Sequence, residues 1–450
     1  MTSRMGHQGW IFGRCWRAVS GALVVGAVLF SATTALRSQD APAYNYRVLY
    51  TFGGAADGGS PTSGLVFDWE GNLYGSAVLG GDLSVSCDYG EPNAGCGAVY
   101  KLDPYGKETV LYAFTGGADG GTLDGLSPTL VRDAAGNLYG TMGTGGDLSA
   151  CGGIGCGLVF KLDPRGKETV LYAFKGEADG QPNGYAPPLI RDEAGNLYGT
   201  TYLGGDLSAC YVEQGGLGCG VVYKVDHAGK ETVLYAFKGT PDGEDPGTFG
   251  ALLRDEAGNL YGTTAGGGNS GWGTVFKLNR AGQETVLYSF TGGADGGEPA
   301  GGLVRDQEGN LYGTTGEGGE FGWGVAYKLD PTGTETVLHT FTGGADGAYP
   351  YAGLVRDAKG NLYGTTLLAG EIFLGGVVYM LDPAGNETVL HNFTGGADGA
   401  FPYATLVLDE AGNLYGTTSS GGDLTSLNAA CAGYGCGVVF ELKRVEAGSH

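Results

Sequence analysis

Basic residues, histidine and helical periodicity are all scarce in this sequence. Lys and Arg together number 25 against 48 Asp and Glu, which leaves a formal charge of −23. A protein this acidic has no electrostatic route to nucleic acid or to an anionic lipid surface. No segment repeats its apolar residues at the helical period, so the sequence argues against a helical core.

Recognisable catalytic motifs are also missing. The sequence has only five His residues, and we find no Ser-centred nucleophile elbow, zinc motif or phosphate-binding loop. His339 and His391 stand where other copies of a repeat have Tyr, so we interpret them as packing substitutions. Acidic residues are plentiful, and paired carboxylates therefore remain open as a catalytic device. On balance we lean against an enzyme.

What the chain has in abundance is repetition. The segment Gly-Asn-Leu-Tyr-Gly occurs seven times in 450 residues, each time with an Asp three residues ahead of its first Gly. Repeats at such a period form solenoids, propellers or arrays rather than one large core. The copies begin at Gly71, Gly136, Gly195, Gly258, Gly309, Gly360 and Gly412.

Each copy predicts four short strands joined by tight turns. In the fifth copy these are residues 302–306, 310–315, 324–330 and 335–341, with Gly-rich or Pro-Gly segments between them. Four antiparallel strands per copy are typical of one propeller blade, and an open solenoid is the alternative. Residues 46–52 form a lone fourth strand and residues 437–442 a third strand with no successor. We therefore predict an all-β, seven-bladed propeller in which residues 46–52 complete the last blade.

The repeat resembles a known family. Asp-x-x-Gly-Asn-Leu-Tyr, then Gly-Thr-Thr and Gly-Val-Val-Tyr-Lys-Leu-Asp, is similar to the GloVer-type tandem repeat of exported bacterial "choice-of-anchor" proteins. More distantly, the hairpin is similar to NHL-type propeller repeats. The resemblance covers nearly all of residues 46–442. It implies an extracellular or surface location and no settled activity.

The N-terminus reads as an export signal. Basic residues up to Arg17 precede an uncharged stretch from Ala18 to about Leu36, so we predict a signal peptide over residues 1–35. An uncleaved membrane anchor is the alternative, and membrane attachment is expected only in that case. We divide the rest into a linker, 36–45, the propeller, 46–443, and a tail, 444–450.

Cysteines occur in pairs between second and third strands. An even number at equivalent positions, together with an export signal, predicts disulfides rather than a metal or redox site. Each bond closes a short loop and is worth about 2–3 kcal/mol in the chain-entropy model. The pairs are Cys87 and Cys96, Cys151 and Cys156, Cys210 and Cys219, and Cys431 and Cys436.

The connections between blades and from second to third strands are long and vary between copies, whereas the other turns are short. Binding residues gather on variable loops of a rigid scaffold, so the face with long loops is the candidate binding face. Aromatic residues there could stack on sugars or anchor a protein partner, or Trp272 and Trp323 could simply replace the disulfides as loop plugs. The candidate ligand-binding residues are Trp272, Trp323, Phe321, Phe373, Tyr349, Tyr351, Phe401 and Tyr403.

Two charged sets recur from blade to blade. An Asp-Gly pair follows every fourth strand, and we expect it to form a turn, with a Ca²⁺ site as the weaker alternative. We predict no other cofactor. These aspartates are Asp57, Asp119, Asp179, Asp242, Asp295, Asp346 and Asp398. The first strands of five copies carry an Arg, for example Arg191, which either lines the channel or pairs with an acid of a neighbouring blade.

Three hypotheses follow. The first is an exported, non-catalytic propeller that binds a glycan or an extracellular protein on its long-loop face. The second is an exported hydrolase or lyase acting on carbohydrate through carboxylates near the channel mouth. The third is a structural component of a cell surface or extracellular assembly.

Overall fold

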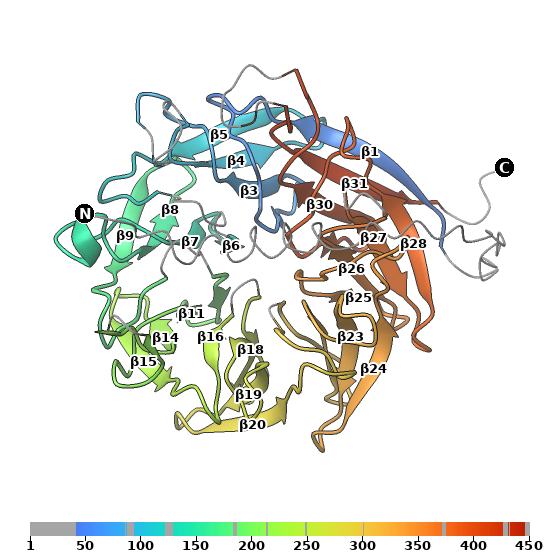
Figure 1. Cartoon of the computed structure of the whole chain (residues 1–450). Coiled ribbons are helices and arrows are strands. Elements are labelled where there is room, and N and C mark those ends of the chain that lie inside the picture. Colours follow the sequence, from blue (N-terminus) through green and yellow to red (C-terminus); the bar gives the residue numbers. More distant parts are fainter. Residues whose placement is uncertain are drawn as a thin grey trace. The chain divides into compact units, whose positions relative to one another are not determined.

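The computed structural model describes residues 42–445 except for several loop segments. The exceptions are residues 86, 88–93, 122–128, 183–186, 213–214, 248–249, 300, 371–374, 426–430 and 432. The predicted signal peptide, most of the linker and Phe373 therefore lie outside the described residues. The described part is a seven-bladed β-propeller, as predicted, with four antiparallel strands per blade and a fifth added to the sheet of blade 4 (Figure 1).

The first three blades follow the order of the sequence from inner to outer strand. Blade 1 consists of β2 (Val66–Phe67), β3 (Leu73–Ala77), β4 (Ala98–Leu102) and β5 (Glu108–Ala113). Blade 2 consists of β6 (Val131–Arg132), β7 (Leu138–Met142), β8 (Leu158–Leu162) and β9 (Glu168–Ala173), with a 3₁₀ turn η1 (Cys151–Gly153). Blade 3 consists of β10 (Ile190–Arg191), β11 (Leu197–Thr201), β14 (Val221–Val225) and β15 (Glu231–Ala236), plus a small hairpin of β12 (Tyr211–Val212) and β13 (Gly215–Gly216).

The next three blades repeat the same arrangement. Blade 4 consists of β17 (Leu253–Arg254), β18 (Leu260–Gly266), β19 (Thr274–Leu278) and β20 (Glu284–Ser289), with β16 (Glu244–Pro246) added beside β18. Blade 5 consists of β21 (Val304–Arg305), β22 (Leu311–Thr315), β23 (Val325–Leu329) and β24 (Glu335–Thr340). Blade 6 consists of β25 (Val355–Arg356), β26 (Leu362–Thr366), β27 (Val377–Leu381) and β28 (Glu387–Asn392).

Blade 7 closes the ring with strands from both ends of the chain. It contains β29 (Val407–Leu408), β30 (Leu414–Thr418) and β31 (Val438–Arg444), and β1 (Tyr44–Thr51) pairs with β31 as its outer strand. The strands run slightly differently from our expectation, since β1 begins two residues before Tyr46 and β31 extends to Arg444. The extra pairing lengthens the seam, and Ala43 O accepts one further hydrogen bond from the Val445 N–H.

The repeated motif is explained by its hairpin. Asp133 accepts hydrogen bonds from the N–H and side-chain amide of Asn137, each at 2.8 Å, and from the Tyr139 hydroxyl at 2.9 Å. Burial alone would raise the pKa of Asp133, but these donors hold it below its usual value. The same set of bonds recurs in every blade. It accounts for Asp, Asn and Tyr at fixed spacing.

The Gly of Leu-Tyr-Gly makes room for an aromatic side chain. A Cβ on Gly75 would lie 2.4 Å from the Tyr100 hydroxyl oxygen on the neighbouring third strand. Tyr100 is buried and meets Phe52 of the preceding blade edge-on, with ring centroids 5.0 Å apart. Similar pairs link other adjacent blades, such as Phe174 and Tyr223 at 5.1 Å. The core is therefore a ring of aromatic contacts between blades.

The arginines of the first strands contact the preceding blade rather than the channel. The Arg191 guanidinium lies over the Tyr139 ring at 5.7 Å, and its charge helps to lower the pKa of Asp133. Arg132, Arg254, Arg305 and Arg356 lie over the equivalent Tyr rings. Of the two roles that the sequence left open, the arrangement matches pairing with a neighbouring blade.

The described residues are almost entirely strands, turns and loops. They include no helix with the length and hydrophobicity of a membrane span.

Candidate functional site

All four predicted cysteine pairs form disulfides. They join Cys87 to Cys96, Cys151 to Cys156, Cys210 to Cys219, and Cys431 to Cys436. In blades 1, 2 and 3, each bond packs against the first Gly after the fourth strand of its own blade. A Cβ on Gly176, for example, would lie 2.6 Å from the Cys151 sulfur. The disulfides thus fasten the long loops to the outer edge of blades 7, 1, 2 and 3.

Trp272 and Trp323 occupy the corresponding place in blades 4 and 5. A Cβ on Gly292 would lie 2.3 Å from the Trp272 ring, and one on Gly343 would lie 2.7 Å from the Trp323 indole nitrogen. Both indoles are partly buried and pack on the core clusters between blades. This placement matches one of the two roles that the sequence left open, in which each Trp replaces a disulfide and packs the loop against the blade. It leaves any ligand role of the two indoles untested.

A row of aromatic rings crosses from blade 5 to blade 6. Trp323 meets Tyr349 edge-on at 5.1 Å, and Tyr349 stacks with Tyr351 at 5.8 Å and 4°. Phe321 stands beside this row with 51% of its side chain exposed. Phe401 and Tyr403 take the same positions in the connection to blade 7 and are partly buried. Candidate aromatics from three blades therefore lie on one side of the long-loop face.

Two of these aromatics sit at strained backbone corners. Tyr349 and Phe401 have φ values of 58° and 56°, each directly before a Pro. The Tyr349 N–H donates to the Trp323 carbonyl at 3.1 Å, and its own carbonyl accepts from the Leu367 N–H at 3.1 Å. The corner therefore links the third strand of one blade to the second strand of the next. Left-handed backbone at a non-Gly residue costs about 1–3 kcal/mol and persists only where its surroundings enforce it.

The channel holds a cavity of about 290 Å³ directly below these connections. Residues from all seven blades line it, mainly small or apolar ones such as Gly64, Thr129 and Ala251, and Tyr403 is its one aromatic. Within the described part of the chain, none of the lining residues carries a charge. The volume lies near the lower end of small-molecule sites, and the lining suits a neutral group.

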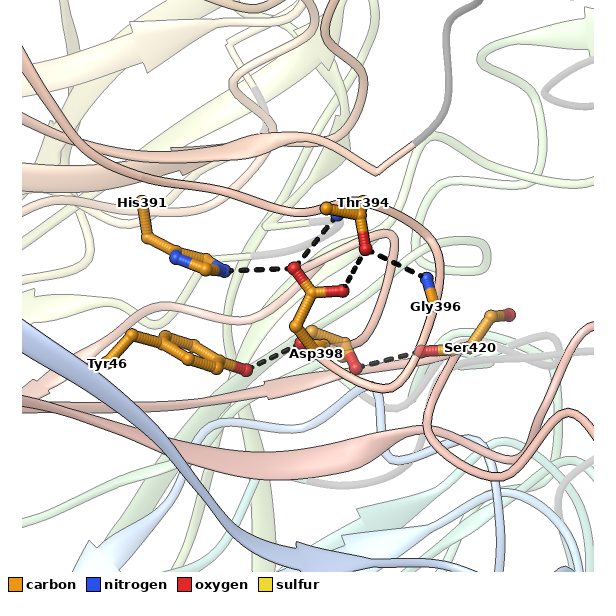
Figure 2. Close-up of polar contacts among 7 residues, drawn as sticks. Tyr46, His391, Thr394, Gly396, Asp398 and Ser420 are labelled. Carbon is orange, nitrogen blue, oxygen red and sulfur yellow. Dashed lines mark hydrogen bonds and ion pairs between the residues drawn. The ribbon is translucent and has the colours of Figure 1, made fainter.

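The Asp-Gly pairs form turns. Asp398 accepts hydrogen bonds from the N–H and hydroxyl of Thr394 and from a ring nitrogen of His391 at 3.2 Å (Figure 2). After the fourth strand of blade 1, the partners of Asp119 are the N–H and hydroxyl of Thr115 and the Tyr112 hydroxyl. The described residues contain no group of three or more acidic, His or Cys side chains placed to hold a metal. These contacts match the turn role, and Ca²⁺ binding at the ring stays a prediction.

A second carboxylate faces these turns, and sequence reasoning missed it. Glu168 opens strand β9, and burial, followed by the charge of Asp119, raises its pKa to about 7. One of its carboxylate oxygens is buried without a hydrogen-bond partner in the structure. The same holds for Glu108, Glu231, Glu284, Glu335 and Glu387. The sequence signal was the Glu-Thr-Val that opens these strands, but the opposing Asp is supplied by a different repeat.

One acidic corner lies on the long-loop face. Asp245 in β16 has a φ of 57° before Pro246, as Glu298 does in blade 5 with 54°. The pKa of Asp245 is raised to about 7, mainly by burial and to a smaller extent by the charge of Glu244. A hydrogen bond with Tyr202 acts in the opposite direction and lowers this pKa. A carboxyl group with such a pKa is half protonated near neutral pH and can act as a proton donor.

The fold and the repeat agree with two comparisons. The model of the Gloeobacter/Verrucomicrobia repeat matches residues 29–212 and 209–429. The chain belongs to this family. Among solved structures, it is similar to virginiamycin B lyase from Staphylococcus aureus, with 10% identity, 89% of this chain and 100% of that chain covered, and a TM-score of 0.54.

Other similar structures are more distant. A gluconolactonase from Xanthomonas campestris has 16% identity over 72% of this repeat protein and 86% of its own chain, with a TM-score of 0.40. A luciferin-regenerating enzyme has 13% identity over 89% and 95% of the two chains, with a TM-score of 0.41. Like the lyase, these are similar to NHL-type propellers. No curated protein matches the sequence. At such identities only the fold is shared.

Proposed function

We propose that this repeat protein is an exported binding scaffold that takes a glycan at the channel mouth of its long-loop face. The observation that carries the proposal is an uncharged cavity that Tyr403 lines, together with the row of aromatic rings that crosses from blade 5 to blade 6. Sugar rings present apolar C–H faces to aromatic rings, and they carry no charge that an acidic protein would repel. The strained corners at Tyr349 and Phe401 support the proposal because they hold the site rigid before a ligand arrives.

Export is part of the proposal. Disulfides persist in oxidising compartments outside the cytoplasm, and four of them are present here. We propose that residues 1–35 direct export and are removed. N-terminal sequencing of the protein from its native host tests this, since a retained apolar segment would indicate a membrane anchor instead.

The binding test uses residues 36–450 and a panel of glycans and polysaccharides. A Phe321→Ala/Tyr403→Ala variant removes one exposed ring and the one aromatic of the cavity. The control is Trp69→Ala/Tyr105→Ala, which removes rings that are 87% and 95% exposed on the short turns of blade 1. We expect the first variant to lose binding at unchanged melting temperature and the control to keep it. Absence of binding by the unaltered protein would favour a protein partner or a structural role.

A carbohydrate-active hydrolase or lyase is the second candidate, and Asp245 is the observation that favours it. A carboxyl group with its pKa raised by burial next to other carboxylates is typical of a catalytic acid. The test is turnover of the same panel by the unaltered protein and by Asp245→Asn. Turnover that Asp245→Asn abolishes while binding persists would establish the enzyme. Equal turnover by both proteins would remove Asp245 from consideration.

A further inference from the structure

Three of the four disulfide loops, those of blades 2, 3 and 7, share a second feature, which is a set of apolar side chains exposed to solvent. Each loop begins with the sequence Gly-Gly-Asp-Leu, followed by Ser or Thr. Each loop ends with a variable residue, then a Gly, then the second Cys, so the variable residue lies two positions before that Cys. The Leu and that variable residue are exposed in the loops of blades 2, 3 and 7. We call this set the apolar arc: Leu148, Ile154, Leu207, Leu217, Leu424 and Tyr434.

Local geometry explains why the leucines of the apolar arc point outward. In blade 2 the Asp147 carboxylate accepts hydrogen bonds from the Ser149 N–H at 2.9 Å and the Ser149 hydroxyl at 2.6 Å. This turn places Leu148 at its apex, with 42% of the side chain exposed. Asp206 with Ser208 and Asp423 with Thr425 make the same turn around Leu207 and Leu424.

The second member in each loop is fixed by its main chain. The carbonyl of Ile154 accepts from the Gly145 N–H at 2.9 Å. The carbonyls of Leu217 and Tyr434 accept equivalent bonds at 2.7 Å, and the following Cys is tied by its disulfide. Tyr434 is 75% exposed, and Ile154 and Leu217 are 40% and 42% exposed. The apolar arc therefore stands on a rigid base and needs little ordering to bind.

The loops that carry the apolar arc belong to blades 2, 3 and 7, and blade 1 lies between blades 7 and 2. Blade 7 adjoins blade 1 through the closing strand, so blades 7, 1, 2 and 3 are neighbours (Figure 1). Blade 1 carries the same turn, with Leu83 partly exposed between Asp82 and Ser84. Among the described residues, most large apolar side chains left exposed belong to this arc. Scattered apolar residues are ordinary, but a row at equivalent positions on adjacent blades indicates a contact surface.

The charge of the loops selects the partner. Residues 78–97, 143–157, 202–220 and 419–437 contain no Lys, Arg or His, and their acidic residues within the described part of the chain are Asp82, Asp147, Asp206 and Asp423. Outside these loops, the charges of Lys175 and Lys238 act on Asp147 and Asp206. Complementary potentials steer association and reject partners of like charge. We propose that the apolar arc is a docking surface for a protein whose contact face carries both basic and exposed apolar side chains. The six residues of the apolar arc are all different from the candidate glycan-binding residues.

The test measures binding of a synthetic amphipathic peptide, with Lys along one face and Leu along the other, to residues 36–450. Two further peptides separate the contributions, one with Lys and Ser and one with Glu and Leu. We expect only the Lys/Leu peptide to bind, with an affinity that falls as salt rises. Hydrogen exchange should show protection in residues 143–157 and 202–220 on binding.

A variant with Leu148, Ile154, Leu207 and Leu217 all changed to Ser keeps the acidic residues and the main-chain bonds. We expect it to bind the Lys/Leu peptide about tenfold more weakly or worse, as loss of a central apolar cluster does. Trp69→Ser/Tyr105→Ser and Phe321→Ala/Tyr403→Ala should leave the affinity unchanged, which also separates this surface from the glycan site. Equal affinity of the Ser variant, equal binding of the Glu/Leu peptide, or no binding of the Lys/Leu peptide would overturn the proposal.

Discussion

At the scale of single residues, the opposed carboxyl groups between blades make folding depend on pH. Glu168 binds its proton up to about pH 7 in the folded protein, whereas the ordinary pKa of Glu is 4.5. A raised pKa in the folded state contributes stability below the unfolded value, and that stability is lost as pH rises toward 7. The groups that face Glu168 are Asp119 and Tyr112 of the neighbouring turn and strand.

We therefore predict that the melting temperature falls between pH 5 and pH 8. His391 opposes this trend weakly, because burial lowers its pKa and its contribution is lost as pH falls. Below about pH 4 the hairpin aspartates such as Asp133, whose pKa is lowered, should lose their contribution as well. Thermal unfolding across this range, read by circular dichroism, checks the prediction.

Glu168→Gln/Glu231→Gln supplies the matched test. Gln has the same shape without the charge, so the variant should melt higher than the unaltered protein at pH 8, and the difference should disappear below about pH 4.5. The control is Glu193→Gln in an exposed hairpin turn, which should leave the slope unchanged. A pH slope that the double variant retains in full would show that the charge of these glutamates does not limit stability.

At the scale of the element, the loop plugs can be tested through the glycines beneath them. Gly292 and Gly271 both have positive φ values, of 73° and 80°. A Cβ on Gly292 would meet the Trp272 ring at 2.3 Å, whereas one on Gly271 has nothing within 4 Å. We predict that Gly292→Ala lowers the free energy of unfolding about 1–3 kcal/mol more than Gly271→Ala does, as overpacking typically costs. Urea unfolding of the two variants measures the difference, and equal losses would place Trp272 away from this Gly in solution.

The short disulfide loops permit a second test at this scale. Cys151→Ser/Cys156→Ser opens a loop with a sequence separation of 5. The chain-entropy model predicts a loss of about 2 kcal/mol in the free energy of unfolding. We also expect faster protease cleavage near Ile154, since the exposed turn loses its anchor. Unchanged stability and cleavage would mean that the main-chain bonds of the loop hold it without the disulfide.

At the scale of the whole molecule, ring closure by β1 is the feature on which the propeller depends. Tyr46 stacks on His391 of blade 6 at 3.7 Å and donates to the Asp398 carbonyl at 2.5 Å (Figure 2). Phe52 follows the strand and is fully buried. Without β1, strand β31 would expose an unpaired edge and the core between blades 6, 7 and 1 would open.

Two truncations test this closure. Removing residues 1–41 leaves β1 intact, and we expect no change in melting temperature. Removing residues 1–52 deletes β1 and Phe52, and we expect a broad, lower transition together with self-association through the exposed edge. Calorimetry and light scattering measure both effects. A sharp transition at the original temperature in the longer truncation would show that β31 needs no partner.

Local chemistry explains which features were predictable from sequence. The Asp-x-x-Gly-Asn-Leu-Tyr hairpin, the disulfide pairs and the closing strand depend on residues close in the chain or on a count of strand types. The turn role of the Asp-Gly pairs is equally local, because the bonds of Asp119 stay within four residues for Thr115 and seven for Tyr112. Such features can be predicted because the residues that form them are neighbours in the chain.

The acidic corner at Asp245 could not be predicted in this way, because burial and the charges of Glu244 and Glu298 raise its pKa together. The candidate aromatics were identified individually, but the contact of Trp323 with Tyr349 and the place of Tyr403 in the cavity could be seen only with the blades side by side.

The sequence by itself therefore determined the repeat, the number of blades, the closing strand and the loop disulfides, since each is written in spacing and turn chemistry. Only the tertiary structure decided what meets across a blade boundary. Glu168 faces Asp119, Arg191 covers Tyr139, and strand β1 from the start of the chain completes blade 7. The physical reason is that such contacts follow from the twist and packing of neighbouring sheets, which bring together residues that no local pattern relates.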